Sequence, residues 1–579
     1  MKTNTKTILL FIMSFALIGF ISFTYAYFSN DIVNNNVKDQ VVETGTLSLR
    51  YVDGPEINMQ NIKPGSTITK TVYVANTGTL DAKYNLVWQE LVNEITNDEM
   101  VIEAKCTRMD ATTESESGSC NDIATKPIKD EIIKKNITIE PSIVHKYDIT
   151  ITFKEMNKDQ NYNQGKKFSG VLGVSEYKAP EPVYCTFDGE MVQGAEYVNG
   201  QYTYRYKQEG IFASSGLAWQ NITSDGWGVQ LTDKTSTDAV TGKVCTYINN
   251  KPVISMVRMF SDSKASSIDL SSFDTSEVTN MNYMFDSSQA TIIDASKFDT
   301  SNVTDMSNMF YNSKATTLDV SSFDTSNVTN MSYMFTSSQA KTIKVFENFD
   351  TSKVTDMSGM FSNSQATTLD VSNFNTSKVT RMSSMFSYSK ATTLDVSNFN
   401  TSKVTDMNGI FGDSQATVLD VSNFDTSNVT DMSNMFSGSK ATTLDVSNFN
   451  TSKVTSMYSM FSKAKVTTLD LSNFDTSNVT NMNYMFSGSQ ATTLDVSNFD
   501  TSKVTDMMYM FYNCRNLKTL YASDKFVTTN VTSDSGMFAN SSNLIGGSGT
   551  VYDSTKTDKT YARIDGGTEL PGYFTLKTN

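Results

Sequence analysis

The chain has 579 residues, which is too long for one ordinary domain and predicts several units unless internal repeats fill the length. It carries 47 Lys and Arg against 62 Asp and Glu, and this formal net charge of −15 argues against nucleic acid or an anionic membrane as the main partner. The chain contains one histidine, His145, so any multi-histidine metal site is excluded.

The N-terminus has the pattern of an export signal. A short basic stretch is followed by 21 largely apolar residues, Ile8 to Phe28, with small residues at Thr24 and Ala26. We therefore expect residues 1–26 to be a signal peptide that is cleaved after Ala26. The alternative is an uncleaved anchor, because 21 apolar residues can span a bilayer. Both alternatives predict a secreted or cell-surface protein with no other membrane segment.

The five cysteines suggest local cross-links. Cys106 lies close in sequence to Cys120, and Cys185 and Cys245 enclose one segment, so each pair is a candidate disulfide that closes a loop. Cys514 is then left over. The alternative is that all five remain thiols in a reducing niche.

Residues 27–180 predict a β-sandwich. Apolar and polar residues alternate in at least five segments separated by turn residues, which is the pattern of half-buried strands. These segments are residues 45–52, 66–78, 83–91, 136–153 and 169–177. His145 falls inside one of them, and we expect it to be an ordinary strand residue and not a metal ligand.

Four motifs carry a family resemblance in this region: AYFSND at 26–31, GTLSL at 45–49, NIKPG at 61–65 and ANTGTL at 75–80. Together they resemble the TasA/camelysin family of Gram-positive secreted proteins. The resemblance implies a jelly-roll-like sandwich, processing by a dedicated signal peptidase, and assembly into biofilm-matrix fibres. Camelysins are described as metalloproteases, but His145 has no ligand cluster beside it in the sequence. We therefore predict no catalytic, cofactor or metal site.

The second half of the chain is an internal repeat. A Met-Phe landmark (once Ile-Phe) recurs from Met259 to Met537, and nine of its eleven intervals are 25 residues long. This period predicts a solenoid of about eleven coils over residues 256–540. The intervals of 26 and 27 residues are expected to form bulges near 344–349 and 521–529. Residues 181–255 and 541–579 are expected to cap its two ends.

One repeat, residues 366–386, predicts the structure of a coil. Thr368, Asp370 and Ser372 alternate with two apolar residues, which indicates a short strand. Thr376 is placed to cap a short α- or 3₁₀-helix that buries Val379, Met382, Met385 and Phe386. The recurrent methionines are expected in the core and not on a metal. A second buried column is expected at Phe374, Phe399, Phe424 and Phe449.

The repeat unit, with variants of LDLSNFDTSNVTNMSxMF, resembles the BspA-like family of bacterial leucine-rich-repeat surface proteins. The resemblance covers about residues 251–540 and implies adhesion to host matrix proteins or to other bacteria. That family often carries a cysteine before the leucines of the strand, and here Cys514 alone keeps it.

An outward column of aspartates runs along the predicted strands, interrupted once by Lys344. Stacked strands lie about 4.8 Å apart, and like charges at that distance repel by about 0.9 kcal/mol per neighbouring pair in water. The column is either merely solvated, or binds cations such as Ca²⁺, or faces a basic partner. Nothing in the spacing selects Ca²⁺. The candidate binding face consists of Asp319, Asp370, Asp395, Asp420, Asp445, Asp470 and Asp495, with Asp269 and Asp294 before them.

The sequence thus predicts a mainly β protein, a sandwich followed by a leucine-rich-repeat-like solenoid. The favoured function is non-enzymatic and cofactor-free: a secreted surface protein whose solenoid binds extracellular or surface proteins, host matrix included. The alternative is a structural component of a biofilm matrix that assembles through the sandwich.

Overall fold

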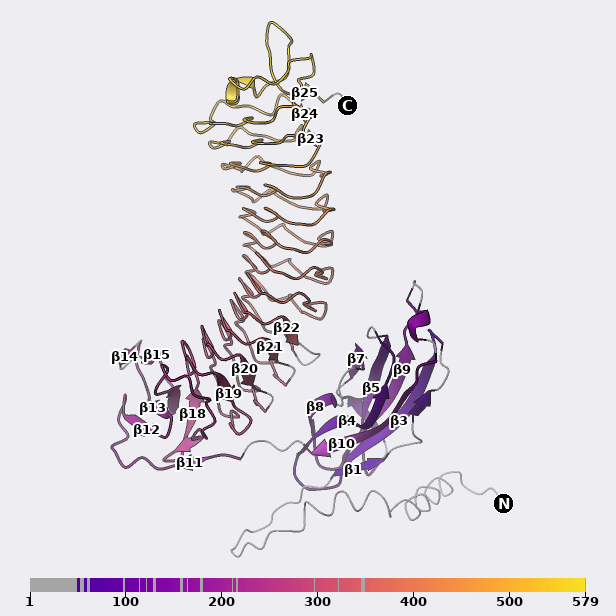
Figure 1. Cartoon of the computed structure of the whole chain (residues 1–579), viewed down its shortest axis with the longest axis vertical. Coiled ribbons are helices and arrows are strands. Elements are labelled where there is room, and N and C mark those ends of the chain that lie inside the picture. Colours follow the sequence, from indigo (N-terminus) through magenta and orange to yellow (C-terminus); the bar gives the residue numbers. More distant parts are fainter. Residues whose placement is uncertain are drawn as a thin grey trace, which may run out of the picture. The chain divides into compact units, whose positions relative to one another are not determined.

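The computed structural model describes residues 49–52, 57–59, 63–96, 99–113, 115–120, 122–128, 132–156, 160–163, 165–176, 181–210, 212–214, 217–295, 297–320, 322–344 and 349–577. They divide into an N-terminal unit that ends at Ser175 and a C-terminal unit that begins at Glu176 (Figure 1). The predicted signal peptide and the motif at 26–31 lie outside the described residues.

Both units are built from β-strands. The described residues contain two short 3₁₀ segments, η1 (Asn161–Asn163) and η2 (Lys559–Tyr561), as their only helices. In this part of the chain no helix has the length and apolar character needed to cross a bilayer.

The N-terminal unit consists of two sheets. Its strands are β1 (Leu49–Val52), β2 (Ile57–Met59), β3 (Thr67–Asn76), β4 (Ala82–Asn93), β5 (Met100–Asp110), β6 (Glu116–Ser119), β7 (Ile123–Pro127), β8 (Ile132–Ile139), β9 (Ile143–Phe153) and β10 (Phe168–Glu176). One sheet has the order β1-β3-β9-β5-β6, with β7 also on β5, and the other has the order β2-β10-β4-β8. Buried side chains of both sheets belong to one core.

Alternation explains these strands. In β9 every second residue from Ile143 to Phe153 is buried, and in β3 the same holds from Lys70 to Asn76. Strands β2 and β5 to β7 were not predicted; in β5 the alternation is short, because Met100 to Ile102 are all buried and the residues after Cys106 are half-buried. Its buried Ile102, Ala104 and Cys106 alternate with the exposed Glu103 and Lys105.

The C-terminal unit begins with a six-stranded sheet of order β11-β17-β18-β16-β13-β12, beside a hairpin of β14 and β15. Their bounds are β11 (Tyr184–Cys185), β12 (Glu196–Asn199), β13 (Tyr202–Tyr206), β14 (Phe212–Ser214), β15 (Leu217–Trp219), β16 (Trp227–Leu231), β17 (Tyr247–Ile248) and β18 (Lys251–Ser255). Tyr202 packs edge-on against Phe273 of the first repeats. One hydrophobic core then runs from this sheet to Phe574, so the sheet closes the N-terminal end of the repeats.

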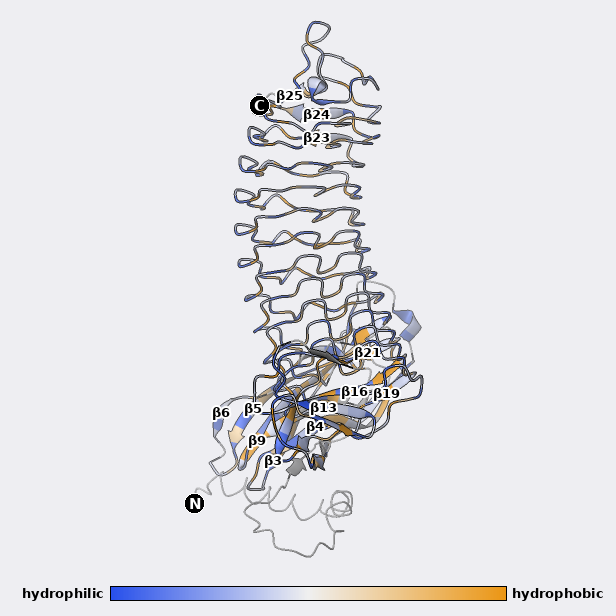
Figure 2. Cartoon of the chain, turned by 90° about the vertical axis from the view of Figure 1, so that its left-hand side faces the viewer, coloured by the Kyte–Doolittle hydropathy of each residue, from blue (hydrophilic) through white to orange (hydrophobic). Residues whose placement is uncertain are grey.

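The repeats form a β-solenoid whose coils stack in parallel (Figure 1). Regular strands are β19 (Ser267–Asp269), β20 (Ile292–Asp294), β21 (Thr317–Asp319), β22 (Thr342–Lys344), β23 (Thr493–Asp495), β24 (Thr519–Ala522) and β25 (Thr575–Leu576). Between β22 and β23 the equivalent segments keep the alternation without regular strands, since Leu394 and Val396 are buried and Asp395 is exposed. Short apolar and polar stretches therefore alternate along each coil (Figure 2).

Two columns of phenylalanine fill the solenoid. From Phe260 to Phe538, eleven successive ring pairs stack with centroids 5.2–5.9 Å apart, which gives about eleven turns. The predicted second column is confirmed as buried, with Phe374 4% and Phe449 1% exposed. Its rings contact the first column; Phe399, for example, lies 6.4 Å from Phe386. The methionines of the repeat are also buried in this core.

The predicted short helix is wrong. Residues 383–388 form overlapping turns, closed by the N–H groups of Met385 and Ser387, which donate to Met382 and Ser384. Ser384 and Tyr388 have positive φ, which a right-handed helix does not allow. The N–H of Phe386 donates to the carbonyl of Ile410 in the next coil, at 2.9 Å. Backbone groups are therefore satisfied between coils and not along a helix.

The extra residues of the longer repeats fall where the register changes. The predicted bulge near 344–349 includes residues 345–348, which lie outside the described residues. Near the C-terminal end, the sequence offset between facing residues of successive coils increases. It is 25 residues from Phe486 to Phe511, 26 from Leu494 to Leu520, and 27 from Asp506 to Ser533. One extra residue therefore precedes β24 and the other follows it; the predicted range 521–529 contains at most one of them.

A first prediction concerns the second phenylalanine column. Replacing Phe399 with Ala should lower the free energy of unfolding of the solenoid by about 3–5 kcal/mol, because a buried ring leaves a cavity between coils. The measurement is urea denaturation followed by circular dichroism. Val418→Thr is the control: Val418 is 64% exposed, its equivalents in neighbouring coils are threonines, and the expected change stays within about 0.5 kcal/mol. Equal effects of the two variants would refute the assigned burial.

A second prediction concerns the positive-φ positions. Lys463 has φ 54°, and the equivalent residues of the flanking coils are Gly438 and Gly488, with φ 65° and 68°. A left-handed conformation costs a non-glycine residue about 1 kcal/mol or more, so Lys463→Gly should stabilise the solenoid by about 1 kcal/mol. Lys463→Val should destabilise it, because a β-branched side chain is least tolerated there. Opposite signs in thermal denaturation are expected; a shift of the same sign in both would contradict the turn geometry.

Candidate functional site

The predicted aspartate column lies on the outside of the solenoid, and most of its carboxylates adjoin a buried leucine or isoleucine of their coil. Asp269 faces Asp294 directly across two coils, and Asp319 faces Lys344. In most of these coils the carboxylate also accepts the N–H of the serine two residues later, as in Asp395, where Ser397 donates its N–H at 3.1 Å and its hydroxyl at 2.6 Å. The side chain of Asp395 thus closes a turn and remains exposed to solvent.

These serine hydrogen bonds lower the carboxyl pKa of Asp395 and of Asp445 below the ordinary value. At Asp470 the hydrogen bonds from Ser472 also lower the pKa, while the charges of Asp445 and Asp495 oppose them. Because the net shifts are downward, these carboxylates are ionised at neutral pH despite their mutual repulsion.

The same turn recurs at two other corners of each coil. At the second corner Asp425 accepts the N–H of Ser427 at 2.9 Å, and Asn450 accepts that of Ser452 at 3.1 Å. At the third corner Asp406 accepts the N–H of Asn408. This role was not predicted from the sequence; the signal was a serine or asparagine two residues after an Asp or Asn, which recurs at three places in most repeats.

Two lysines pair with the aspartate column. Lys344 lies 3.6 Å from the carboxylate of Asp319, and Lys577 of the C-terminal segment lies 2.9 Å from that of Asp495. For the carboxylates between these two pairs, the described residues include no ion pair. We call these five residues the acidic face: Asp370, Asp395, Asp420, Asp445 and Asp470.

The cysteines form two disulfides, Cys106–Cys120 and Cys185–Cys245, and Cys514 is buried and free. Burial raises the pKa of the Cys514 thiol to about 12. Its place is that of a buried serine in other coils, such as Ser489.

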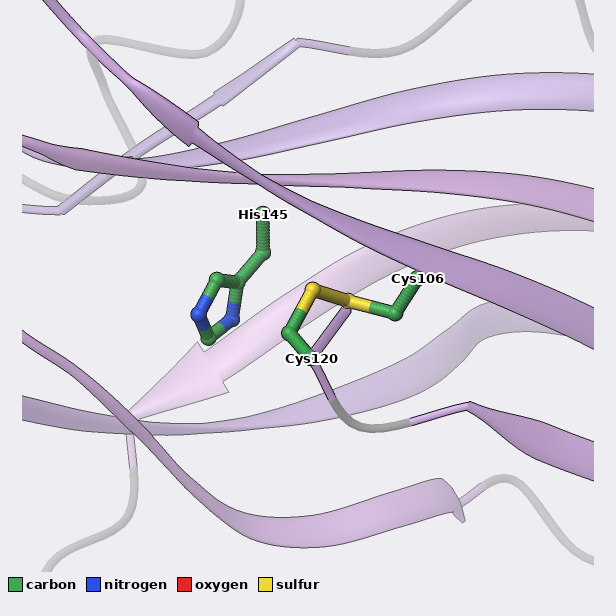
Figure 3. A group of neighbouring side chains, drawn as sticks. All are labelled: Cys106, Cys120 and His145. Atoms are coloured by element: carbon green, nitrogen blue, oxygen red, sulfur yellow. A yellow bond between two sulfur atoms is a disulfide. The ribbon is translucent and has the colours of Figure 1, made fainter. Parts of the chain in front are cut away.

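His145 lies beside the first disulfide (Figure 3). In the pairing of β5 with β9, Cys106 faces Tyr147 and Arg108 faces His145, so Cys106 and His145 are diagonal neighbours on one face of the sheet. The two sulfurs and a ring nitrogen of His145 all lie within 4.8 Å of one another. Cys106 and His145 are buried, and Cys120 is half-buried.

A tyrosine of the opposite sheet holds the imidazole. The hydroxyl of Tyr84, from β4, lies 2.9 Å from Nδ1 of His145 and 3.0 Å from the hydroxyl of Tyr147. Burial lowers the pKa of His145 to about 4, while the charge of Glu140 opposes this shift. The imidazole is therefore neutral at pH 7.

Two family models match the chain. The model described as "Mycoplasma protein of unknown function, DUF285" matches residues 234–346, 337–447 and 430–547, which together exceed half of the chain. The chain belongs to this family. This match covers the solenoid. Residues 5–170 of the same chain match a second model, "Camelysin metallo-endopeptidase". No curated protein matches the chain.

The camelysin name implies a metal, and the described residues offer one group of three or more candidate ligands, Cys106, Cys120 and His145. As a disulfide, the two sulfurs are not thiolates and do not ligate a metal. One histidine remains, with its Nδ1 against Tyr84. With the disulfide intact, the group of Cys106, Cys120 and His145 therefore does not fit a catalytic zinc ion, which needs three protein ligands.

A third prediction follows from the buried imidazole. Because His145 is the only histidine of the chain, selective ¹³C-histidine labelling gives one imidazole signal, and its NMR titration midpoint should lie near pH 4. The unfolded chain binds this proton near pH 6.5, so the N-terminal unit should lose about 3 kcal/mol of stability as the pH falls from 6.5 to 4. A midpoint near 6.5 would show that the ring is solvated.

Proposed function

We propose that this chain is an exported, non-catalytic bacterial surface protein whose solenoid binds basic regions of extracellular proteins through the acidic face. The observation that carries the proposal is the uniform charge of that column. Apart from Lys344, every coil from Asp269 to Asp495 places an aspartate there.

The turn does not require this charge. At the second corner, where an Asx side chain closes the same turn, Asn375, Asn400 and Asn450 replace aspartate without changing the hydrogen bond. Asparagine serves equally well as the acceptor in this turn. The turn alone therefore does not explain why the acidic face uses only aspartate. Neighbouring like charges repel, so asparagine at this position would make the stacked coils more stable than aspartate does. A basic partner supplies the compensation that the solenoid itself lacks.

The face also has a shape that fits an extended partner. Consecutive coils present the same carboxylate at the same height, beside exposed threonines such as Thr392 and Thr393. A partner with several lysines or arginines can therefore make the same contact in each coil. Long-range attraction by a chain of net charge −15 increases the association rate of such a partner.

The remaining parts of the proposal rest on resemblance. The TasA/camelysin-like motifs and the apolar N-terminus support export, and the BspA-like repeat supports an adhesive role on host matrix or other cells. The single histidine and the disulfide-bonded sulfurs support a role without metal-dependent catalysis. The other function in keeping with these resemblances is assembly into a matrix through the N-terminal unit.

The test replaces Asp395, Asp420 and Asp445 with asparagine, which keeps the turns and removes three charges. Binding to an immobilised lysine-rich peptide and to immobilised extracellular-matrix proteins is measured at low and moderate salt. We expect affinity to fall about tenfold at low salt, and the salt dependence to weaken, because the contact is electrostatic and exposed.

The control variant carries Asp425→Asn, Asp475→Asn and Asp500→Asn at the second corner. It removes the same number of charges at positions where the chain itself uses asparagine in other coils. Its affinity should stay near that of the unaltered chain. Equal losses of affinity in both variants would show that net charge alone, and not the acidic face, determines binding. No loss in either variant would show that the partner binds elsewhere, and assembly through the N-terminal unit would be the next hypothesis.

A further inference from the structure

The group formed by Cys106, Cys120 and His145 is unlike any other in the described residues. In the part of the chain that the structure describes, this is the one place where three or more candidate metal ligands lie within 4.8 Å of one another. The second disulfide, Cys185–Cys245, has the amide of Asn199 beside its sulfurs and no histidine. We propose that reduction of the Cys106–Cys120 disulfide creates a zinc site, held by the two sulfurs and a ring nitrogen of His145.

The ligand atoms need to move only a short way. Around a tetrahedral zinc ion with Zn–S near 2.3 Å and Zn–N near 2.0 Å, two sulfurs lie about 3.8 Å apart, and sulfur and nitrogen about 3.6 Å apart. The reduced sulfurs must separate from bonding distance, about 2 Å, to about 3.8 Å, and the imidazole nitrogen, now within 4.8 Å of both, must come to about 3.6 Å from each. Cys120 can supply this movement, because it is half-buried and follows β6, a short strand whose residues are all exposed.

The surroundings hold the ligands of the site in place. Tyr84 holds the imidazole at Nδ1, and Tyr147 in turn contacts Tyr84, so the ring has a fixed orientation beside the sulfurs. Figure 3 shows Nδ1 on the side of the ring that faces the disulfide, so zinc bound there would take the place of the Tyr84 hydroxyl. On the other side, the carboxylate of Asp122 accepts the N–H of Cys106 at 2.6 Å and fixes that cysteine's backbone.

The charge of the complex suits a buried position. Zn²⁺ with two thiolates and a neutral imidazole has no net charge, so its formation places no uncompensated charge in the hydrophobic core. Three protein ligands leave a fourth position open to water or another small ligand.

The reduction is a balanced thiol exchange. A dithiol attacks the sulfur of Cys120, the less buried of the two cysteines, breaks the S–S bond through a mixed disulfide, and leaves as its own disulfide. Two electrons and two protons thereby convert the bridge into two thiols. Zinc then displaces the two thiol protons into solvent. The site therefore exists only where a dithiol reductant is present, and oxidation releases the metal.

The experiment compares the whole chain before and after reduction by a phosphine, which adds no competing thiol. Zinc is titrated against a chromophoric chelator without oxygen. We expect one tightly bound zinc ion per reduced chain and none in the oxidised chain. Cobalt in place of zinc should give the near-ultraviolet charge-transfer absorption of a thiolate ligand. Zinc should also protect Cys106 and Cys120, but not Cys185 and Cys245, from alkylation read by mass spectrometry.

Variants separate this site from other thiols. Cys185→Ser with Cys245→Ser should keep the zinc ion. His145→Gln should weaken zinc binding more than about 100-fold, as expected for the loss of a ligand. No zinc in the reduced chain, or protection of Cys185 and Cys245 instead, would overturn the proposal. The alkylation pattern of the unaltered chain decides the matter even if a variant fails to fold.

Discussion

The hydrogen bonds between coils are the constraint on which the solenoid depends. Each coil donates backbone N–H groups to carbonyls of its neighbours, as Phe361 does to Met385 at 2.9 Å and Thr380 to Thr355 at 2.9 Å. Such bonds keep the same offset only where successive coils have equal length; in the coils of 26 and 27 residues the facing residues shift by one and two positions. The period of 25 residues follows from this requirement, and the equivalent side chains of all coils must then lie in columns.

The columns explain why polar residues are found inside the solenoid. Thr351 is 1% exposed, and its hydroxyl accepts the N–H of Asn375 at 2.7 Å and donates to the carbonyl of the same residue at 3.1 Å. One side chain thus satisfies both backbone groups of a residue in the next coil. The buried Ser364 similarly accepts the N–H of Ala366. Phenylalanine and methionine supply the burial, and these hydroxyls close the backbone at the corners between apolar columns.

This division shows which parts of the structure the sequence could predict. Equal spacing and apolar residue type determine the coils and the burial of Phe399, and both are visible in the repeat. The helix prediction was wrong because residues with positive φ interrupt that segment. In the repeat used for the prediction these residues are Ser384 and Tyr388, whose types do not indicate a left-handed conformation. The glycines that replace Ser384 in other coils, Gly359 and Gly409, do indicate it. The group around His145 depends on strand register and on a tyrosine from the other sheet. Neither follows from one sequence.

The two units therefore differ in the chemistry that they offer. A solenoid repeats each side chain once per coil, so its carboxylates form an extended surface of equal, individually weak contacts whose total grows with the number of coils engaged. Such a surface suits binding to a long partner and gives no single position where an acid, a base and a nucleophile converge. The N-terminal unit repeats nothing. There the pairing of β5 with β9 brings two sulfurs to the only imidazole of the chain, and the opposite sheet fixes that ring through Tyr84. The unique arrangement of side chains around His145 thus lies in the N-terminal unit, whereas the solenoid presents the same side chains once per coil.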